Sequence, residues 1–203
     1  MLYLLDLLGT IVFAMTGSLV ARRKQLDIFA VVVIAFVTAV GGGTLRDMIL
    51  GNTPVFWVND PSYIVAILLG VLITIILVRF NWLPNRPLLI ADACGLALFT
   101  VIGTQVTLIL DVHWSIVIVM GVMSSVAGGM IRDVLSDDIP LVLRKEIYAT
   151  ASLLGAMCYL IMVSMGFTTI AIIVSMSLTL ILRLTAIWRG WSLPIDSIGF
   201  GVD

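Results

Sequence analysis

Two similar stretches of the sequence place glycines and a pair of opposite charges inside long apolar runs. The first is AVGGGTLRDMIL (residues 39–50) and the second is SVAGGMIRDVLS (residues 125–136). A glycine inside a helix costs about 1 kcal/mol relative to alanine. A full charge inside a membrane helix is expensive and marks a functional site by default.

The glycines of these stretches have two interpretations. They are Gly41, Gly42, Gly43, Gly128 and Gly129. Small residues let membrane helices pack closely. Alternatively, consecutive glycines open a helix and expose backbone, which is tolerated at membrane depth only where it is packed in protein or lines water. Because the stretch occurs twice with charges beside it, we favour two kinked helices that line a pathway.

Hydroxyl side chains accompany the glycines. Thr38 and Ser124 lie one turn before them, and Ser125 follows Ser124. Such hydroxyls either line a hydrated path or bond back to helix carbonyls. Thr44 and Asp47 match a capping box for a second half-helix after the first glycines.

The charges of the two stretches need partners. Arg46 and Asp47 are adjacent, as are Arg132 and Asp133, and neighbouring residues on a helix do not face each other. We therefore predict the pairs Asp6–Arg46 and Asp92–Arg132. These charges act either in gating or as structural pins between helices.

The composition indicates an integral membrane protein. Of the 203 residues, 61% are hydrophobic and only 11% are charged, against about 25% charged in soluble domains. The net charge of −1 argues against a nucleic-acid partner. No catalytic constellation, metal-ligand cluster or nucleotide-binding loop occurs, so we expect no enzyme and no cofactor.

The apolar runs predict an all-α membrane domain over residues 1–203. A bilayer core needs about 20 apolar residues for each helix. On this measure seven spans fall near residues 2–21, 28–50, 61–79, 88–110, 114–136, 146–165 and 167–187. The charged run 137–146 is most simply a solvated loop.

The basic residues predict an orientation for seven spans. One face holds Arg22, Arg23, Lys24, Arg79, Arg86, Arg132, Arg144, Lys145, Arg183 and Arg189. The opposite face holds only Arg46. Positive residues stay cytoplasmic, so we expect the N-terminus outside and the C-terminus in the cytoplasm, in a plasma or inner membrane.

The sequence repeats itself at an offset of 86 residues. Asp6 then aligns with Asp92, Gly42 with Gly128, and Arg46 with Arg132, without a gap. The first repeat covers 2–79, the second 88–165, and the helix near 167–187 lies outside both. Three spans for each repeat make the second copy insert upside down, which is typical of transport proteins with a path at the repeat interface.

The paired glycine motifs resemble the prokaryotic TRIC family, the relatives of trimeric intracellular cation channels, also described as a bacterial glycine transporter domain. The resemblance covers nearly the whole chain. It implies a homotrimer in the lipid bilayer, with one pore through each subunit, lined by the kinked second and fifth helices. Ala127 stands where the second triplet would begin with glycine.

Three functions remain open from the residues themselves. The first is a monovalent cation channel for potassium, with potassium or sodium as permeant ions. The second is a secondary transporter for glycine or a similar zwitterion, since arginines beside a path suit a carboxylate. The third is a non-conducting assembly subunit, against which the paired motifs argue. Family resemblance, and not residue chemistry, selects the cation channel.

Overall fold

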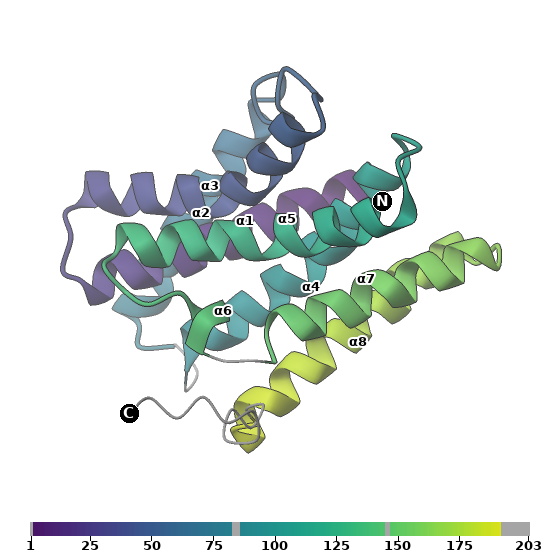
Figure 1. Cartoon of the computed structure of the whole chain (residues 1–203). Helices are drawn as coiled ribbons and strands as arrows, with labels where there is room; N and C mark the ends of the chain where they lie inside the picture. The colour runs from purple at the N-terminus through teal and green to yellow at the C-terminus, as the bar shows by residue number, and fades with distance from the viewer. Residues whose placement is uncertain (1, 83–85, 145–146, 192–203) are drawn as a thin grey trace, which may run out of the picture.

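The computed structural model describes residues 2–82, 86–144 and 147–191, and the regular structure of this part is helical (Figure 1). The helices are α1 (Leu2–Arg23), α2 (Ile28–Ile49), α3 (Ser62–Arg79), α4 (Pro87–Leu108), α5 (Trp114–Leu135), α6 (Leu141–Arg144), α7 (Ala149–Ser164) and α8 (Thr168–Arg189). The predicted all-α fold is confirmed, and six of the seven predicted spans match long helices closely.

Six helices are long and apolar enough to cross a membrane by length and composition, namely α1 to α5 and α8. The seventh apolar helix, α7, has 16 residues, or about 24 Å at 1.5 Å per residue. It begins at Ala149, later than the predicted span, whose first residue lies outside the described part. The chain is a multi-pass membrane protein.

Helix α6 was not predicted. It forms within the run 137–146, for which the sequence predicts a solvated loop. The backbone N–H of Leu141 donates to Asp133 Oδ2 over 2.9 Å, so this segment is tied to the end of α5. Asp137, Ile139, Leu143 and Arg144 are exposed, as expected of a solvated loop, but the segment also contains this short helix and is held by a buried carboxylate at the end of α5.

Helices α1 and α4 form the centre of the bundle. They pack against each other; α1 also contacts α2 and α3, and α4 also contacts α5, α7 and α8. Helices α2 and α5 pack together as well, and Figure 1 shows them running in opposite directions. The helix outside the predicted repeats, α8, covers α4 and α7.

The contact between α1 and α4 is reciprocal. The ring of Phe99 lies 3.2 Å from where a Cβ of Gly9 would be, and the ring of Phe13 occupies the same place at Gly95. The two phenylalanine rings are 5.0 Å apart between centroids. In each helix a glycine leaves room for the phenylalanine ring of the other helix. Adding 86 to the residue numbers of one contact, Gly9 and Phe13, gives those of the other, Gly95 and Phe99.

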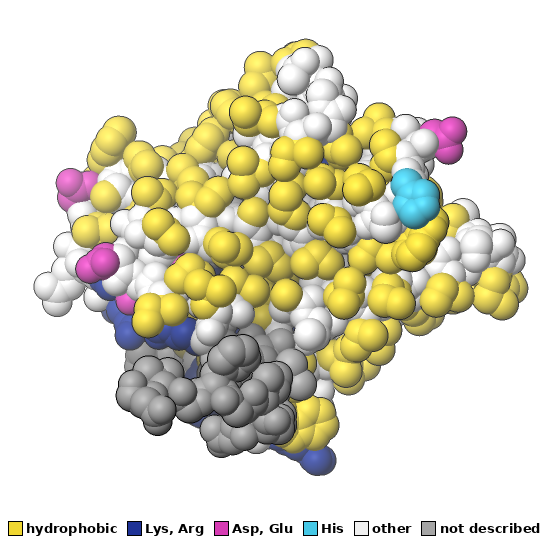
Figure 2. All heavy atoms as spheres, in the orientation of Figure 1, with side chains coloured by type: hydrophobic (Ala, Val, Ile, Leu, Met, Phe, Trp, Pro, Cys, Tyr) yellow, Lys and Arg dark blue, Asp and Glu magenta, His cyan; other side chains and the backbone are white. Residues whose placement is uncertain are grey.

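The surface of the bundle is apolar along the helices and charged at its ends. Figure 2 shows hydrophobic side chains over most of the visible face, with Lys and Arg gathered at the lower left. Large apolar side chains such as Leu68, Ile173 and Ile181 are exposed on α3 and α8. Because such a surface would be unfavourable in water, it fits contact with lipid.

Candidate functional site

The two glycine stretches meet where α2 crosses α5. A Cβ added to Gly42 would overlap the carbonyl oxygen of Ser124, and one added to Gly128 would overlap the carbonyl oxygen of Thr38. The two contacts are equivalent in the repeat, since Gly42 corresponds to Gly128 and Thr38 corresponds to Ser124. The backbones of α2 and α5 therefore touch directly, and no ion fits between them at this crossing.

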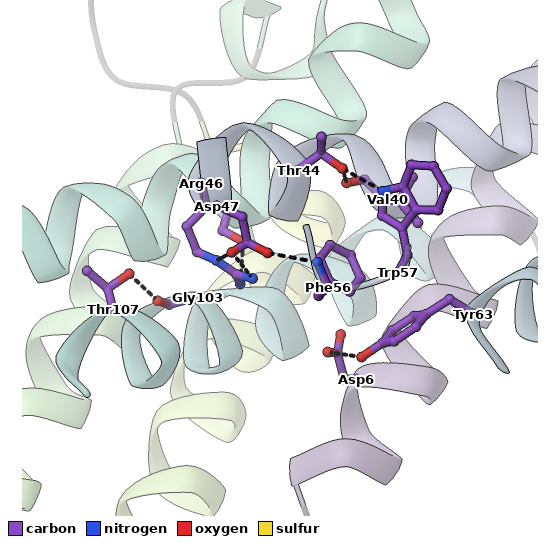
Figure 3. Close-up of polar contacts among 11 residues, drawn as sticks. Asp6, Val40, Thr44, Arg46, Asp47, Phe56, Trp57, Tyr63, Gly103 and Thr107 are labelled. Atoms are coloured by element: carbon purple, nitrogen blue, oxygen red, sulfur yellow. Dashed lines mark hydrogen bonds and ion pairs between the residues drawn. The ribbon is translucent and has the colours of Figure 1, made fainter. Parts of the chain in front are cut away.

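Helix α2 stays α-helical through its three glycines. The predicted opening into two half-helices is wrong, and so is the capping box. The hydroxyl of Thr44 donates to the carbonyl of Val40 over 2.8 Å and accepts the indole N–H of Trp57 over 3.0 Å (Figure 3). A bend of the helix axis at these glycines stays a prediction.

The remaining glycines of the stretches serve separate contacts. The ring of Phe56 lies 2.6 Å from where a Cβ of Gly43 would be. This glycine therefore leaves room for the loop after α2 to pack against the helix. At Gly41 the nearest atom is the end of the flexible Ile131 side chain, 3.0 Å away. Beside Gly129 the nearest atoms belong to Tyr148, Asp92 and Arg132.

The hydroxyls beside the glycines are buried and bonded. Thr38 donates to the carbonyl of Ile34 over 2.6 Å, within its own helix. Ser125 shares a hydrogen bond of 2.8 Å with Ser152 of α7, which in turn shares one of 2.7 Å with Thr100 of α4. These three hydroxyls form a buried polar contact between α4, α5 and α7.

Replacing Ser152 with alanine is expected to destabilise the protein modestly, because it leaves two buried hydroxyls without a shared partner. Hydrogen bonds between membrane helices contribute about 0.6 kcal/mol on average and about 1.7 kcal/mol at most. The measurement is the free energy of unfolding in detergent. The matched control is Ser164→Ala, since Ser164 is exposed and bonds only within its own helix. Equal losses in both variants would contradict the interhelical role.

The first charge pair joins neighbouring residues. Arg46 donates from Nε and Nη2 to Asp47 Oδ1 over 2.9 and 2.7 Å, and Asp47 Oδ2 accepts the backbone N–H of Phe56 over 3.1 Å (Figure 3). Both side chains are buried. The expectation that neighbours on a helix cannot pair was wrong, because the arginine side chain is long enough to curl back.

Asp6 does not form the predicted pair with Arg46. Its Oδ2 accepts the hydroxyl of Tyr63 over 2.7 Å (Figure 3), and no ion pair joins it to a described residue. Arg46 instead directs Nη1 toward the hydroxyl of Ser124, at 3.5 Å. The prediction failed because the Arg46 guanidinium binds Asp47 and points toward Ser124 of α5.

The second charge cluster contains the other predicted pair. Arg132 Nη1 lies 2.8 Å from Asp92 Oδ1 and 2.9 Å from the hydroxyl of Thr16. Arg132 Nε donates to Asp133 Oδ1 over 2.8 Å. The pair Asp92–Arg132 is confirmed, and one buried guanidinium serves two carboxylates from α4 and α5.

Three residues of these clusters were missed from the sequence. Tyr63 binds Asp6, Tyr148 packs beside Asp92, and Arg183 of α8 lies over the Tyr148 ring at 4.6 Å. A gap of one residue after the loops would align Tyr63 with Tyr148, and Gly70 with Gly155. Arg183 lies outside the repeat, so no alignment points to it. The sequence places it on the basic face of the protein, but its side chain is buried.

The polar side chains of the site pair charges with one another. The described residues contain no group of three or more His, Cys, Asp or Glu able to hold a metal ion. In the loop before α3, hydrogen bonds from the Tyr3 hydroxyl and from Ser62 lower the pKa of Asp60. The two arginines of the glycine stretches, Arg46 and Arg132, each pair with a carboxylate, whereas Arg183 lies over the Tyr148 ring and donates to the carbonyl of Ile147.

Comparison with known proteins places the chain in a family. The glycine transporter family model matches residues 3–79 and 89–164. A UPF0126 membrane protein of Vibrio cholerae is 45% identical over 199 residues, covering 96% of this chain and 82% of the relative. The inner membrane protein YadS of Escherichia coli is 43% identical over 201 residues, covering 96% of this chain and 95% of the relative.

Solved structures of similar proteins support the same family assignment. A TRIC trimeric intracellular cation channel orthologue from Rhodobacter sphaeroides matches with a TM-score of 0.86 at 40% identity, over 94% of this chain and 98% of that chain. A prokaryotic TRIC channel solved in potassium chloride matches with a TM-score of 0.84 at 34% identity, over 95% and 98%. The chain therefore belongs to the glycine transporter family of membrane proteins, the family of the prokaryotic TRIC channels.

Proposed function

We propose that this protein is a channel for monovalent cations, with potassium as the main permeant ion. The observation that carries the proposal is the match to solved TRIC cation channels over nearly the full length of both chains. The same family model bears the description of a glycine transporter, so a carrier for glycine is the alternative outcome of the test.

The pairing of the arginines favours a cation over a zwitterion. Free arginines beside a path would hold a carboxylate, which was the main argument for glycine. Arg46 and Arg132 each lie within 2.8 Å of a carboxylate oxygen. Their charges are therefore compensated, and neither acts as a barrier to cations nor as a carboxylate receptor.

The path runs at the interface of two inverted repeats, along α2 and α5. Two observations support the repeats. The family model matches two segments that fall within the predicted ranges 2–79 and 88–165, and the contacts at Gly42 and Gly128 exchange under one offset. Since the helix backbones touch at this crossing, conduction requires the ions to pass beside it or the two helices to separate.

The assembly is a homotrimer with one path in each subunit, and its N-terminus lies outside. Support for self-association comes from the similar TRIC channel, whose name describes it as trimeric. Support for the orientation comes from the charge distribution, with visible basic side chains gathered at one end of the bundle (Figure 2), because positive residues stay cytoplasmic.

Proteoliposomes test the channel against the carrier. Vesicles loaded with potassium chloride and diluted into a medium low in potassium should develop a negative interior potential, read with a voltage-sensitive dye. Protein-free vesicles are the control. Vesicles that develop no potential but accumulate glycine in a saturable manner would overturn the proposal in favour of a carrier.

A further inference from the structure

The two charge clusters are equivalent by the repeat but differ in one respect. Asp6 corresponds to Asp92, since the two lie 86 residues apart. Asp92 is completely buried and paired with Arg132 over 2.8 Å. Asp6 is only half-buried and bonds to the Tyr63 hydroxyl over 2.7 Å. One copy of the carboxylate is locked in an ion pair, and the other is not.

The cause of the difference is the direction of the two guanidinium groups. Arg132 gives Nε to Asp133 and keeps Nη1 for Asp92. Arg46 gives both Nε and Nη2 to Asp47. Its remaining nitrogen points to Ser124 of α5 instead of to α1, so no ion pair joins Asp6 to a described residue.

Helix α8 increases the difference. It brings Arg183 over Tyr148, beside the cluster of Asp92. The second cluster then holds two arginines against two aspartates and is formally neutral. The first cluster holds Arg46 against Asp6 and Asp47 and carries a formal charge of −1. No described helix supplies a second arginine there, because α8, which carries Arg183, packs mainly against α4 and α7.

The end of the bundle where α1 begins is acidic beyond this cluster. Asp60 lies in the loop before α3, and Asp111 in the loop between α4 and α5. Among the described residues, Arg46 is the one lysine or arginine at that end. Fixed negative charge at the mouth of a narrow path raises the local cation concentration, and acidic side chains are the common selectors of cation pores.

We infer that Asp6 is the side chain that concentrates cations at the outer mouth of the path and helps to exclude anions. This role rests on the proposed channel function. Asp6 differs from Asp60 and Asp111, which lie in loops, because helix α1 carries it and its carboxylate accepts the Tyr63 hydroxyl (Figure 3). The equivalent Asp92 serves only to hold α4 and α5 together.

The test compares single-channel currents of wild-type protein, Asp6→Asn and Asp111→Asn in planar bilayers. Asparagine keeps an oxygen for the Tyr63 hydroxyl, so the fold is retained. Coulomb's law gives about a twofold change in cation concentration for a unit charge at about 10 Å in water. We therefore expect Asp6→Asn to lower the potassium conductance about twofold or more at low salt. Asp111, on an exposed loop, should have a smaller effect.

Salt dependence separates a charge effect from a damaged pore. Screening shortens the range of a charge from about 30 Å at 0.01 M to about 3 Å at 1 M. The loss in Asp6→Asn should therefore disappear at 1 M potassium chloride, and Asp6→Glu should conduct like wild type. An unchanged conductance in Asp6→Asn, an equal loss in Asp111→Asn, or a loss that persists at 1 M would each overturn the inference. A wild-type protein without current would instead refute the channel function.

Discussion

Replacing Arg132 with alanine is expected to destabilise the folded protein by about 3–5 kcal/mol, the usual cost of removing one partner of a buried ion pair. Asp92 and Asp133, whose side chains are 0% and 5% exposed, would lose their cation. The loss of stability is measured as the free energy of unfolding in detergent. The temperature at which heated protein no longer elutes as a folded peak in size-exclusion chromatography is a second measure.

The matched control is Lys24→Ala. Lys24 lies 3.1 Å from Asp138, but the two side chains are 31% and 25% exposed. An exposed pair contributes about 0–1 kcal/mol, so this variant should resemble wild type. The double variant Arg132→Met with Asp92→Asn should recover part of the loss, because one fewer buried charge is left unpaired. Equal stability of Arg132→Ala and Lys24→Ala would refute the structural role of this cluster.

Adding a methyl group at Gly42 should weaken the crossing of α2 and α5. Its Cβ would overlap a backbone carbonyl of α5, which cannot move without shifting the helix. Overpacking costs about 1–3 kcal/mol, and a clash with rigid backbone belongs at the upper end of this range, above the roughly 1 kcal/mol that alanine gains over glycine within a helix. The net effect of Gly42→Ala on the free energy of unfolding is therefore a loss.

The neighbouring glycine provides the control. Gly41→Ala meets only the flexible end of Ile131, at 3.0 Å, while the gain in helix propensity is the same. Gly41→Ala should therefore be neutral or stabilising, and Gly128→Ala should behave like Gly42→Ala because its contact is the equivalent one. The close crossing would be disproved by a Gly42→Ala protein as stable as Gly41→Ala.

The positions of the helices could be predicted from the sequence. The spans predicted near 28–50 and 114–136 correspond to Ile28–Ile49 and Trp114–Leu135. Hydrophobic length determines such spans, and loops with proline, glycine and charges end them. The short helix α6 escaped prediction because a hydrogen bond to a distant carboxylate stabilises it, and hydrophobic pattern contains no sign of that bond.

The charge pairs were predicted only in part. The repeat correctly paired Asp92 with Arg132, but the same argument failed for Asp6 and Arg46. The difference depends on which way an arginine side chain bends, and the same residue types occur in both copies. Arg183 was placed on the basic face and not in this cluster, because α8 lies outside the repeat and has no second copy for comparison.

The glycines show a further limit of sequence reasoning. Two interpretations were open, an opened helix and a close contact. The structure supports the contact at Gly42 and Gly128, where the helix stays intact. Sequence alone could not decide, because a glycine that exposes backbone and a glycine that admits a neighbouring backbone leave the same pattern.

The reversal potential in a potassium chloride gradient tests the central claim, a cation-selective path through this protein. Purified protein in a planar bilayer with a tenfold gradient should give discrete currents that reverse near the potassium equilibrium potential, about 59 mV in magnitude. Currents that reverse near the chloride potential, of opposite sign, or the absence of any current from correctly folded protein, would contradict the claim.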